Sequence, residues 1–183
     1  MKVLVVSKKA VRPFGRVRLG FHSVIKLWLA ALTLGLSGLA LAEVLVGQVV
    51  GVSDGDTITL LDANRNQHKI RLAGIDAPEK AQAFGQASKN SLSDLVYGKQ
   101  VTVYWDKTDR YQRTVGKVTL NDQDICLEQV KRGMAWHYKQ YQRDQTPQDR
   151  LKYDQAEREA RHNRIGLWAD VSPVEPSKFR HSK

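Results

Sequence analysis

Two short stretches of the sequence place carboxylates beside tight turns. Asp54 and Asp56 flank Gly55, and Asp76 and Glu79 flank an Ala-Pro pair. Carboxylate oxygens bind hard divalent cations, and they can remove or orient a proton of a water molecule. Asp-Gly turns are also common in hairpins, and Asp tolerates the bends around proline. Taken singly, either stretch could therefore be catalytic or simply an exposed turn.

Three arginines are candidates for binding an anion. Arg71 stands between Ile70 and Leu72 in a stretch with strand-like alternation, where no neighbour in the sequence neutralises it. Arg110 and Arg113 lie in a polar turn. A guanidinium stays charged and can donate two parallel hydrogen bonds to a phosphate, which a lysine ammonium cannot do. Considered alone, each arginine could equally be a solvated surface residue.

Hydrophobic periodicity predicts the elements that must hold these residues. Alternating or valine-rich stretches bounded by turn residues indicate five strands, at residues 44–52, 57–60, 69–74, 101–105 and 114–120. Apolar spacing and end signals indicate three helices, at residues 83–97, 125–132 and 147–162. Short strands with helices between and after them favour an α+β, mainly β fold, a five-stranded OB-fold-type barrel with three helices. The candidate residues then cluster where strands end.

Jointly, the motifs resemble the staphylococcal-type thermonuclease family. The similarity rests on residues 53–57, 70–79 and 108–113, and on an ending in which residues 133–136 precede Tyr138 and Tyr141 and residues 166–168 follow. It covers residues 44–169, with the separated motifs in the same order and spacing. The resemblance implies a five-stranded barrel with three helices. It also implies calcium-dependent cleavage of phosphodiester bonds in DNA and RNA, with 3′-phosphate products.

The resemblance assigns catalytic roles to three residues. Arg71 and Arg113 match the family's two guanidinium positions, and Glu79 matches the residue that is taken as the general base. These side chains suit the reaction, because a phosphodiester is an anion attacked by water. Its hydrolysis needs positive charge on the phosphate oxygens and a carboxylate that deprotonates or orients the water.

The resemblance also implies a calcium site. Asp56 and Asp76 match the family's carboxylate ligands, and Ala77 stands where the type member has a threonine that contributes its backbone carbonyl. A carbonyl ligand tolerates that substitution. Calcium prefers oxygen donors, and a few carboxylates, one carbonyl and water molecules suffice. No His/Cys cluster suggests a zinc site.

Substrate contacts follow from the same comparison, and a rival function remains open. The expected substrate-binding residues are Arg110, Tyr111, Tyr138 and Tyr141. Tyr138 and Tyr141 could equally pack the rim of the barrel. The alternative function is a non-catalytic module that binds single-stranded nucleic acid on the same barrel, with bases stacked on aromatic side chains. Because Arg71, Glu79 and Arg113 are all present, the sequence favours the nuclease. The expected partners are DNA and RNA; the sequence implies no stable protein partner and favours a monomer.

The charge is distributed unevenly along the chain. The formal net charge is +10, but the first 42 residues contain seven basic residues and no acid, whereas residues 43–183 carry 22 basic and 19 acidic residues, a net charge of +3. A basic stretch, an uncharged run and Ala40-Leu41-Ala42 predict a secretory signal peptide at residues 1–42. We therefore expect a secreted or periplasmic protein, or an inner-membrane anchored one if the signal stays uncleaved.

The remaining residues define the predicted domains. Residues 43–170 form the expected nuclease domain, and residues 171–183, with two prolines and three serines, are predicted to be a flexible tail. The single cysteine, Cys126, excludes a disulfide within the chain. It is expected to be a half-buried apolar residue, with a bridge to another molecule as the minor alternative.

Overall fold

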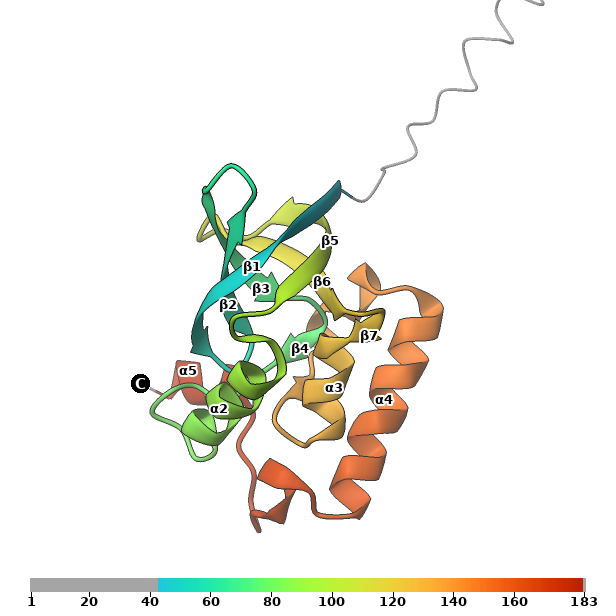
Figure 1. Ribbon diagram of the computed structural model, residues 1–183. Helices are drawn as coiled ribbons and strands as arrows, with labels where there is room; N and C mark the ends of the chain where they lie inside the picture. Colours follow the sequence, from blue (N-terminus) through green and yellow to red (C-terminus); the bar gives the residue numbers. More distant parts are fainter. Residues whose placement is uncertain (1–42, 183) are drawn as a thin grey trace, which may run out of the picture. The chain divides into compact units, whose positions relative to one another are not determined.

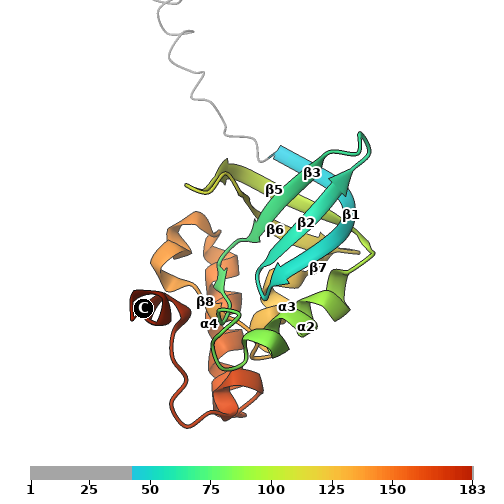
Figure 2. The same ribbon diagram turned by 90° about the vertical axis from the view of Figure 1, so that its left-hand side faces the viewer.

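Five strands of the sheet close into a barrel. In the computed structural model, which describes residues 43–182, these strands are β1 (Glu43–Asp54), β2 (Thr57–Asp62), β3 (Gln67–Leu72), β5 (Gln100–Thr108) and β6 (Thr114–Leu120). Their order is β3-β2-β1-β5-β6, and a parallel pairing of β3 with β6 joins the two ends. All the other pairings between these strands are antiparallel (Figures 1 and 2). The predicted barrel is confirmed.

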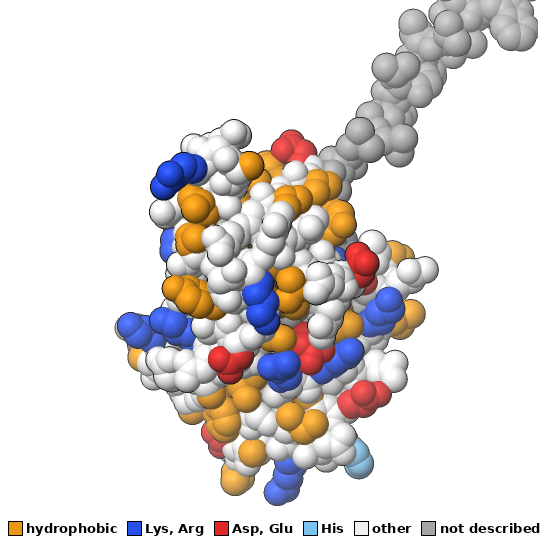
Figure 3. Space-filling view, viewed as in Figure 1, with side chains coloured by type: hydrophobic (Ala, Val, Ile, Leu, Met, Phe, Trp, Pro, Cys, Tyr) orange, Lys and Arg blue, Asp and Glu red, His pale blue; other side chains and the backbone are white. Residues whose placement is uncertain are grey.

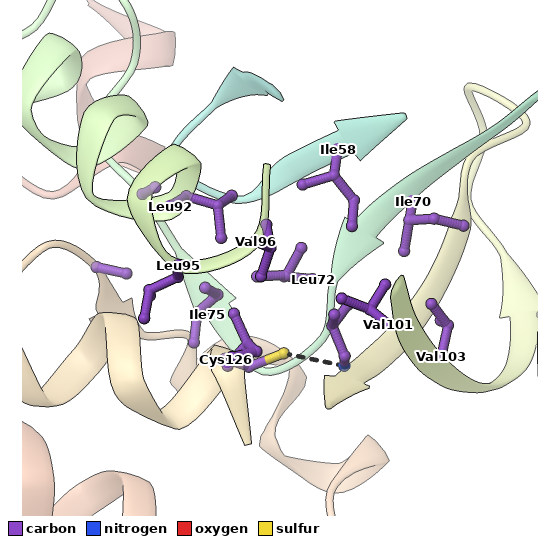
Figure 4. Close-up of a cluster of buried hydrophobic side chains, with 14 of the residues drawn as sticks. Ile58, Ile70, Leu72, Ile75, Leu92, Leu95, Val96, Val101, Val103 and Cys126 are labelled. Carbon is purple, nitrogen blue, oxygen red and sulfur yellow. Dashed lines mark hydrogen bonds between the residues drawn. The ribbon is translucent and has the colours of Figure 1, made fainter. Parts of the chain in front are cut away.

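The inner face of the barrel is filled by aliphatic side chains at alternating strand positions. Ile58 and Leu60 on β2 and Ile70 and Leu72 on β3 are at most 1% exposed, because one face of each strand points into the barrel. Side chains of α2 and α3, among them Leu92, Leu95 and Cys126, complete the same cluster (Figure 4). The long strand β1 pairs with both β2 and β5 by bending at an irregularity after Val49.

Three helices lie where the sequence predicts them: α2 (Gly85–Val96), α3 (Ile125–Lys131) and α4 (Pro147–His162). Helices α2 and α3 pack on the barrel, and α4 packs on α3. Asp124 caps α3 by accepting a hydrogen bond from the Leu127 amide at 3.0 Å. Thr146 caps α4 by accepting one from the Asp149 amide at 3.1 Å, and Pro147 occupies the first turn. These are the caps expected from the sequence.

Short elements connect the barrel to the helices. β4 (Ile75–Asp76) pairs with β8 (Trp136–His137), and β7 (Gln123–Asp124) pairs with β6. The 3₁₀ helices are η2 (Lys139–Asp144) and η3 (Gly166–Ala169). Trp168 packs edge-to-face on Trp136 with 4.3 Å between ring centroids, so it is a core residue at the end of the domain, as expected.

The segment after residue 170 differs from the flexible tail that its composition predicts. Residues Pro176–His181 form the short helix α5 at the C-terminal end marked in Figure 2, and its Arg180 contacts Asp76 of β4. Pro176 is buried, and the Gln82 side-chain amide donates a hydrogen bond to the Val174 carbonyl at 2.6 Å. Contacts made by other parts of the chain therefore order a segment that has little tendency to order alone.

The predicted signal peptide lies outside the described residues. Within residues 43–182, no helix has the length and hydrophobicity needed to cross a membrane.

Candidate functional site

One cavity of about 870 Å³ collects most of the residues proposed from the sequence. It is bounded by the end of β3, the β5–β6 hairpin, η2 and α5. Nine of the ten predicted site residues line it: Asp56, Arg71, Ala77, Glu79, Arg110, Tyr111, Arg113, Tyr138 and Tyr141. The tenth, Asp76, is only 2% exposed and contacts two arginines of the cavity wall.

The turn between β1 and β2 is shaped by a close approach to α2. A Cβ atom on Gly55 would lie 1.8 Å from the Ser88 hydroxyl and 2.8 Å from the Ala77 side chain, so no larger residue fits at this position. The Asp54 carboxylate accepts a hydrogen bond from the Asp56 amide at 3.1 Å and holds the turn closed. The glycine thus serves tertiary packing as well as the hairpin.

Asp56 links the two carboxylate motifs directly. Its Oδ2 accepts a hydrogen bond from the Ala77 amide at 2.7 Å, and its Oδ1 accepts one from the Thr57 hydroxyl at 3.1 Å. Burial raises the pKa of Asp56 to about 7; Arg71 opposes this rise, and the nearby Asp54 adds to it. A positive charge beside Asp56 would favour its ionised form.

Arg71 lies between the two buried aspartates. It comes from β3, where it pairs with Thr57 of β2, and its guanidinium forms ion pairs with Asp56 through Nη1 and with Asp76 through Nη2, the latter at 2.9 Å. Although burial alone would lower the pKa of Arg71, the two carboxylates raise it. Asp76 follows β3 by four residues and Asp56 lies before β2, and the alternation pattern within β3 does not indicate that Arg71 pairs with either of them.

The donor set here fits a hard cation that keeps part of its water shell. Within residues 43–182 no cluster of three or more His, Cys, Asp or Glu side chains has metal-binding geometry, so protein carboxylates alone do not enclose an ion. Asp56 and Asp76 are nevertheless buried, all-oxygen and held close by the shared Arg71. Two carboxylates can hold Ca²⁺ or Mg²⁺, because these ions complete their coordination with carbonyls and water.

Glu79 is placed at the cavity wall by a turn of its own backbone. Its amide donates to the Gln82 side chain at 3.1 Å, and its carbonyl accepts from the Gln82 amide at 2.8 Å. The carboxylate is partly exposed, and one oxygen contacts Nη1 of Arg180 at 2.7 Å. The side chain is therefore accessible to a water molecule in the cavity.

Arg113 is fixed by Asp109 at the tip of the β5–β6 hairpin. The Asp109 carboxylate accepts from Nε of Arg113 at 2.8 Å, lies 2.7 Å from its Nη2, and also accepts from the amides of Tyr111 and Arg113. Burial opposes ionisation, but these hydrogen bonds lower the pKa of Asp109. Asp109 thus keeps its charge and restricts the rotamers of Arg113.

Aromatic rings stand at two edges of the cavity. Arg110 and Arg113 lie over the Tyr111 ring, 4.9 and 5.4 Å from its centroid. On the η2 side, the centroids of Tyr138 and Tyr141 are 4.9 Å apart. All three tyrosines line the cavity, and Tyr111 and Tyr141 are more than half exposed. Exposed rings of this kind offer surfaces on which nucleic-acid bases stack.

Two residues near the site are absent from the sequence-based set. Gln129 of α3 is completely buried, and its amide donates to the carbonyls of Gly55 at 2.9 Å and Ser88 at 3.2 Å. A glutamine on the apolar face of a helix was the signal that could have identified it. Arg180 of α5 reaches Asp76 and Glu79, and nothing in the tail composition predicts that contact.

Comparison with known proteins identifies similar chains. The family model described as "Staphylococcal nuclease homologue" matches residues 69–170. An "uncharacterized endonuclease" of Haemophilus influenzae is 52% identical over 136 residues, which cover 74% of this chain and 73% of that protein. A "micrococcal nuclease" of Shigella flexneri is 41% identical over 145 residues, which cover 74% of this chain and 80% of the Shigella protein. The family match contains Arg71, Glu79 and Arg113, whereas Arg180 lies beyond its end.

Proposed function

The chain belongs to the staphylococcal nuclease family, and from that premise we propose that it is a calcium-dependent endonuclease. It would hydrolyse phosphodiester bonds of DNA and RNA at the 5′ oxygen and leave 3′-phosphate ends. The observation that carries this proposal is the Asp56–Arg71–Asp76 cluster, which opens on the same cavity as Glu79 and Arg113.

The proposed roles of the site residues come from the family resemblance, and the contacts are compatible with them. Arg71 and Arg113 bind the phosphate from two elements, β3 and the β5–β6 hairpin, and donate to the oxygens on which negative charge grows in the transition state. Glu79 accepts or orients a proton of the attacking water. Asp109 keeps the Arg113 guanidinium in place, so little reorganisation is needed during the reaction.

The proposed metal ligands are Asp56, Asp76 and the carbonyl of Ala77. A bound calcium ion would supply positive charge to a phosphate oxygen. Asp56 gains most from such a neighbour, since burial raises its pKa to about 7 and a cation favours the ionised carboxylate.

Substrate binding would depend on local contacts. Lys and Arg side chains are interspersed with Asp and Glu on the face shown in Figure 3, and residues 43–183 carry a net charge of only +3. Affinity for long DNA should therefore be modest, with a salt dependence set by a few phosphate contacts. The proposed contacts are Arg110, Tyr111, Tyr138 and Tyr141, which lie at the two edges of the cavity.

The test is cleavage of an end-labelled single-stranded DNA with calcium and with excess chelator. We expect fragments that carry 3′-phosphates with calcium and no cleavage with chelator. The Glu79→Gln variant, purified identically, controls for contaminating nucleases. Cleavage in excess chelator would contradict the calcium assignment, and binding without any cleavage would favour the non-catalytic module.

We further propose that the protein is exported and that it is a monomer. The basis for export is the basic and apolar stretch at residues 1–42. The burial of Cys126 hinders a disulfide bond to another molecule and so favours the monomer. Intact-mass measurement of the extracytoplasmic protein should show a chain that begins near Glu43. Retention of residues 1–42 would instead support the anchored form.

A further inference from the structure

The guanidinium of Arg180 forms ion pairs with two carboxylates of the proposed catalytic site. Nη1 donates to Oδ1 of Asp76 at 3.2 Å and to Oε1 of Glu79 at 2.7 Å, while Nη2 donates to Oδ2 of Asp76 at 3.0 Å. One side chain from the end of the chain thus pairs with both oxygens of a proposed calcium ligand. It also pairs with the carboxylate proposed to act on water.

A separate set of contacts holds the segment that carries Arg180. The Gln82 amide donates to the Val174 carbonyl, and Pro176 is buried at the start of α5. The helix has six residues, and Ser177, Arg180 and His181 line the cavity. The arginine is therefore delivered to the site by a docked segment.

The contacts of this segment are compatible with release. The Arg180 side chain is 37% exposed, Lys178 is 73% exposed, and α5 is too short to be stable alone. Short terminal segments commonly belong to the least stable part of a fold, where local opening requires little free energy.

We propose that residues 174–182 are an internal competitor of the active site, in which Arg180 takes the place that calcium needs at Asp76. This inference rests on the proposed function. A guanidinium and a calcium ion cannot share the same two carboxylate oxygens, so each lowers the apparent affinity of the other. Calcium binding then releases α5, frees Glu79 and opens that wall of the cavity to substrate.

Calcium affinity measured by calorimetric titration with CaCl₂ tests the competition directly. Arg180→Gln should bind calcium about tenfold more tightly than the wild type, because the binding-competent state no longer competes with a docked one. Arg180→Lys keeps the charge but loses the paired donors, so it should gain about threefold. Lys178→Gln is the matched control, since it removes a charge from the same helix at an exposed side chain that forms an ion pair with Glu175 and not with the proposed site.

The possible outcomes separate the two proposals. Equal affinity in all four proteins would overturn the competition while leaving the calcium site intact. A gain in Lys178→Gln equal to that in Arg180→Gln would reduce the effect to general charge and would also overturn it. Lower oligonucleotide affinity of Arg180→Gln at unchanged calcium affinity would make Arg180 a substrate contact instead. No calcium binding by any of them would overturn the proposed function itself.

A spin label at position 182 gives a readout that does not depend on activity. Cys126 is buried and its thiol pKa is raised by burial, so Ser182→Cys provides a selective labelling site in the native protein. Calcium should increase the mobility of the label. In the Arg180→Gln background, the label should be mobile before calcium is added. If calcium changed the mobility of the label neither in the wild-type background nor in the Arg180→Gln background, the proposal would be overturned.

Discussion

Nη2 of Arg71 lies 2.9 Å from Oδ1 of Asp76, so a proposed phosphate-binding group and a proposed metal ligand form one ion pair. The chain makes this possible by turning sharply at Gly74, whose φ of +74° favours glycine, before β4 begins. The same guanidinium contacts Asp56. Changes at any member of this cluster should therefore affect both metal and substrate.

The first prediction concerns Asp56. An asparagine at this position can still accept the hydrogen bond from the Ala77 amide, so Asp56→Asn should fold, but it removes one of the two carboxylates proposed to bind calcium. The calcium concentration that gives half-maximal cleavage should rise at least about tenfold, because calcium affinity depends on the ligand charge. Calcium titration of the cleavage rate measures this. Asp122→Asn, at an exposed turn, is the control, and an equal response of both variants would exclude Asp56 as a ligand.

The second prediction concerns Gln129, which supports the Asp54–Thr57 turn from below. Gln129→Leu leaves the carbonyls of Gly55 and Ser88 without their side-chain donor and should lower the free energy of unfolding by about 2 kcal/mol. Urea denaturation measures the loss. The exposed substitution Gln155→Leu should stay within about 0.5 kcal/mol of wild type. If Gln129→Leu were as stable as wild type, the turn would not depend on this support.

The third prediction concerns the only cysteine. Cys126 lies among buried aliphatic side chains (Figure 4) and has no exposed surface. Its Sγ lies 3.5 Å from the Val118 amide. Because burial raises its thiol pKa, a disulfide reagent at pH 8 should not react with the folded protein and should react with one thiol per chain in denaturant. Rapid labelling of the folded protein would show that the helix α3 opens readily.

The sequence was sufficient for the elements of the fold because their signals are local. Alternation of aliphatic residues identified the five barrel strands, and Asp124 and Thr146 marked helix starts through hydrogen bonds to nearby amides. The side-chain partners of the site residues could not be predicted from the sequence. Arg71 meets Asp56 only because the β2–β3 pairing brings it beside Thr57, and no pattern along one strand specifies that contact.

Residues 171–183 show more clearly that contacts between distant parts of the chain cannot be predicted from local sequence. Prolines and serines after residue 170 indicate a segment with little structure of its own, and that expectation describes its intrinsic tendency. Its order comes from Gln82 and from the carboxylates of Asp76 and Glu79, which lie about a hundred residues earlier in the chain. Contacts across such a separation are visible only in the folded structure.

The central claim is that Arg71, Glu79 and Arg113 act on the transition state of phosphodiester hydrolysis. The Arg113→Lys variant tests this claim most directly. The substitution keeps the positive charge but loses the donor geometry that Asp109 maintains. On a short oligonucleotide with saturating calcium, we expect the turnover number to fall at least about 100-fold while the dissociation constant changes little. Unchanged turnover in Arg113→Lys, or a wild-type protein that binds the oligonucleotide without cleaving it, would contradict the account.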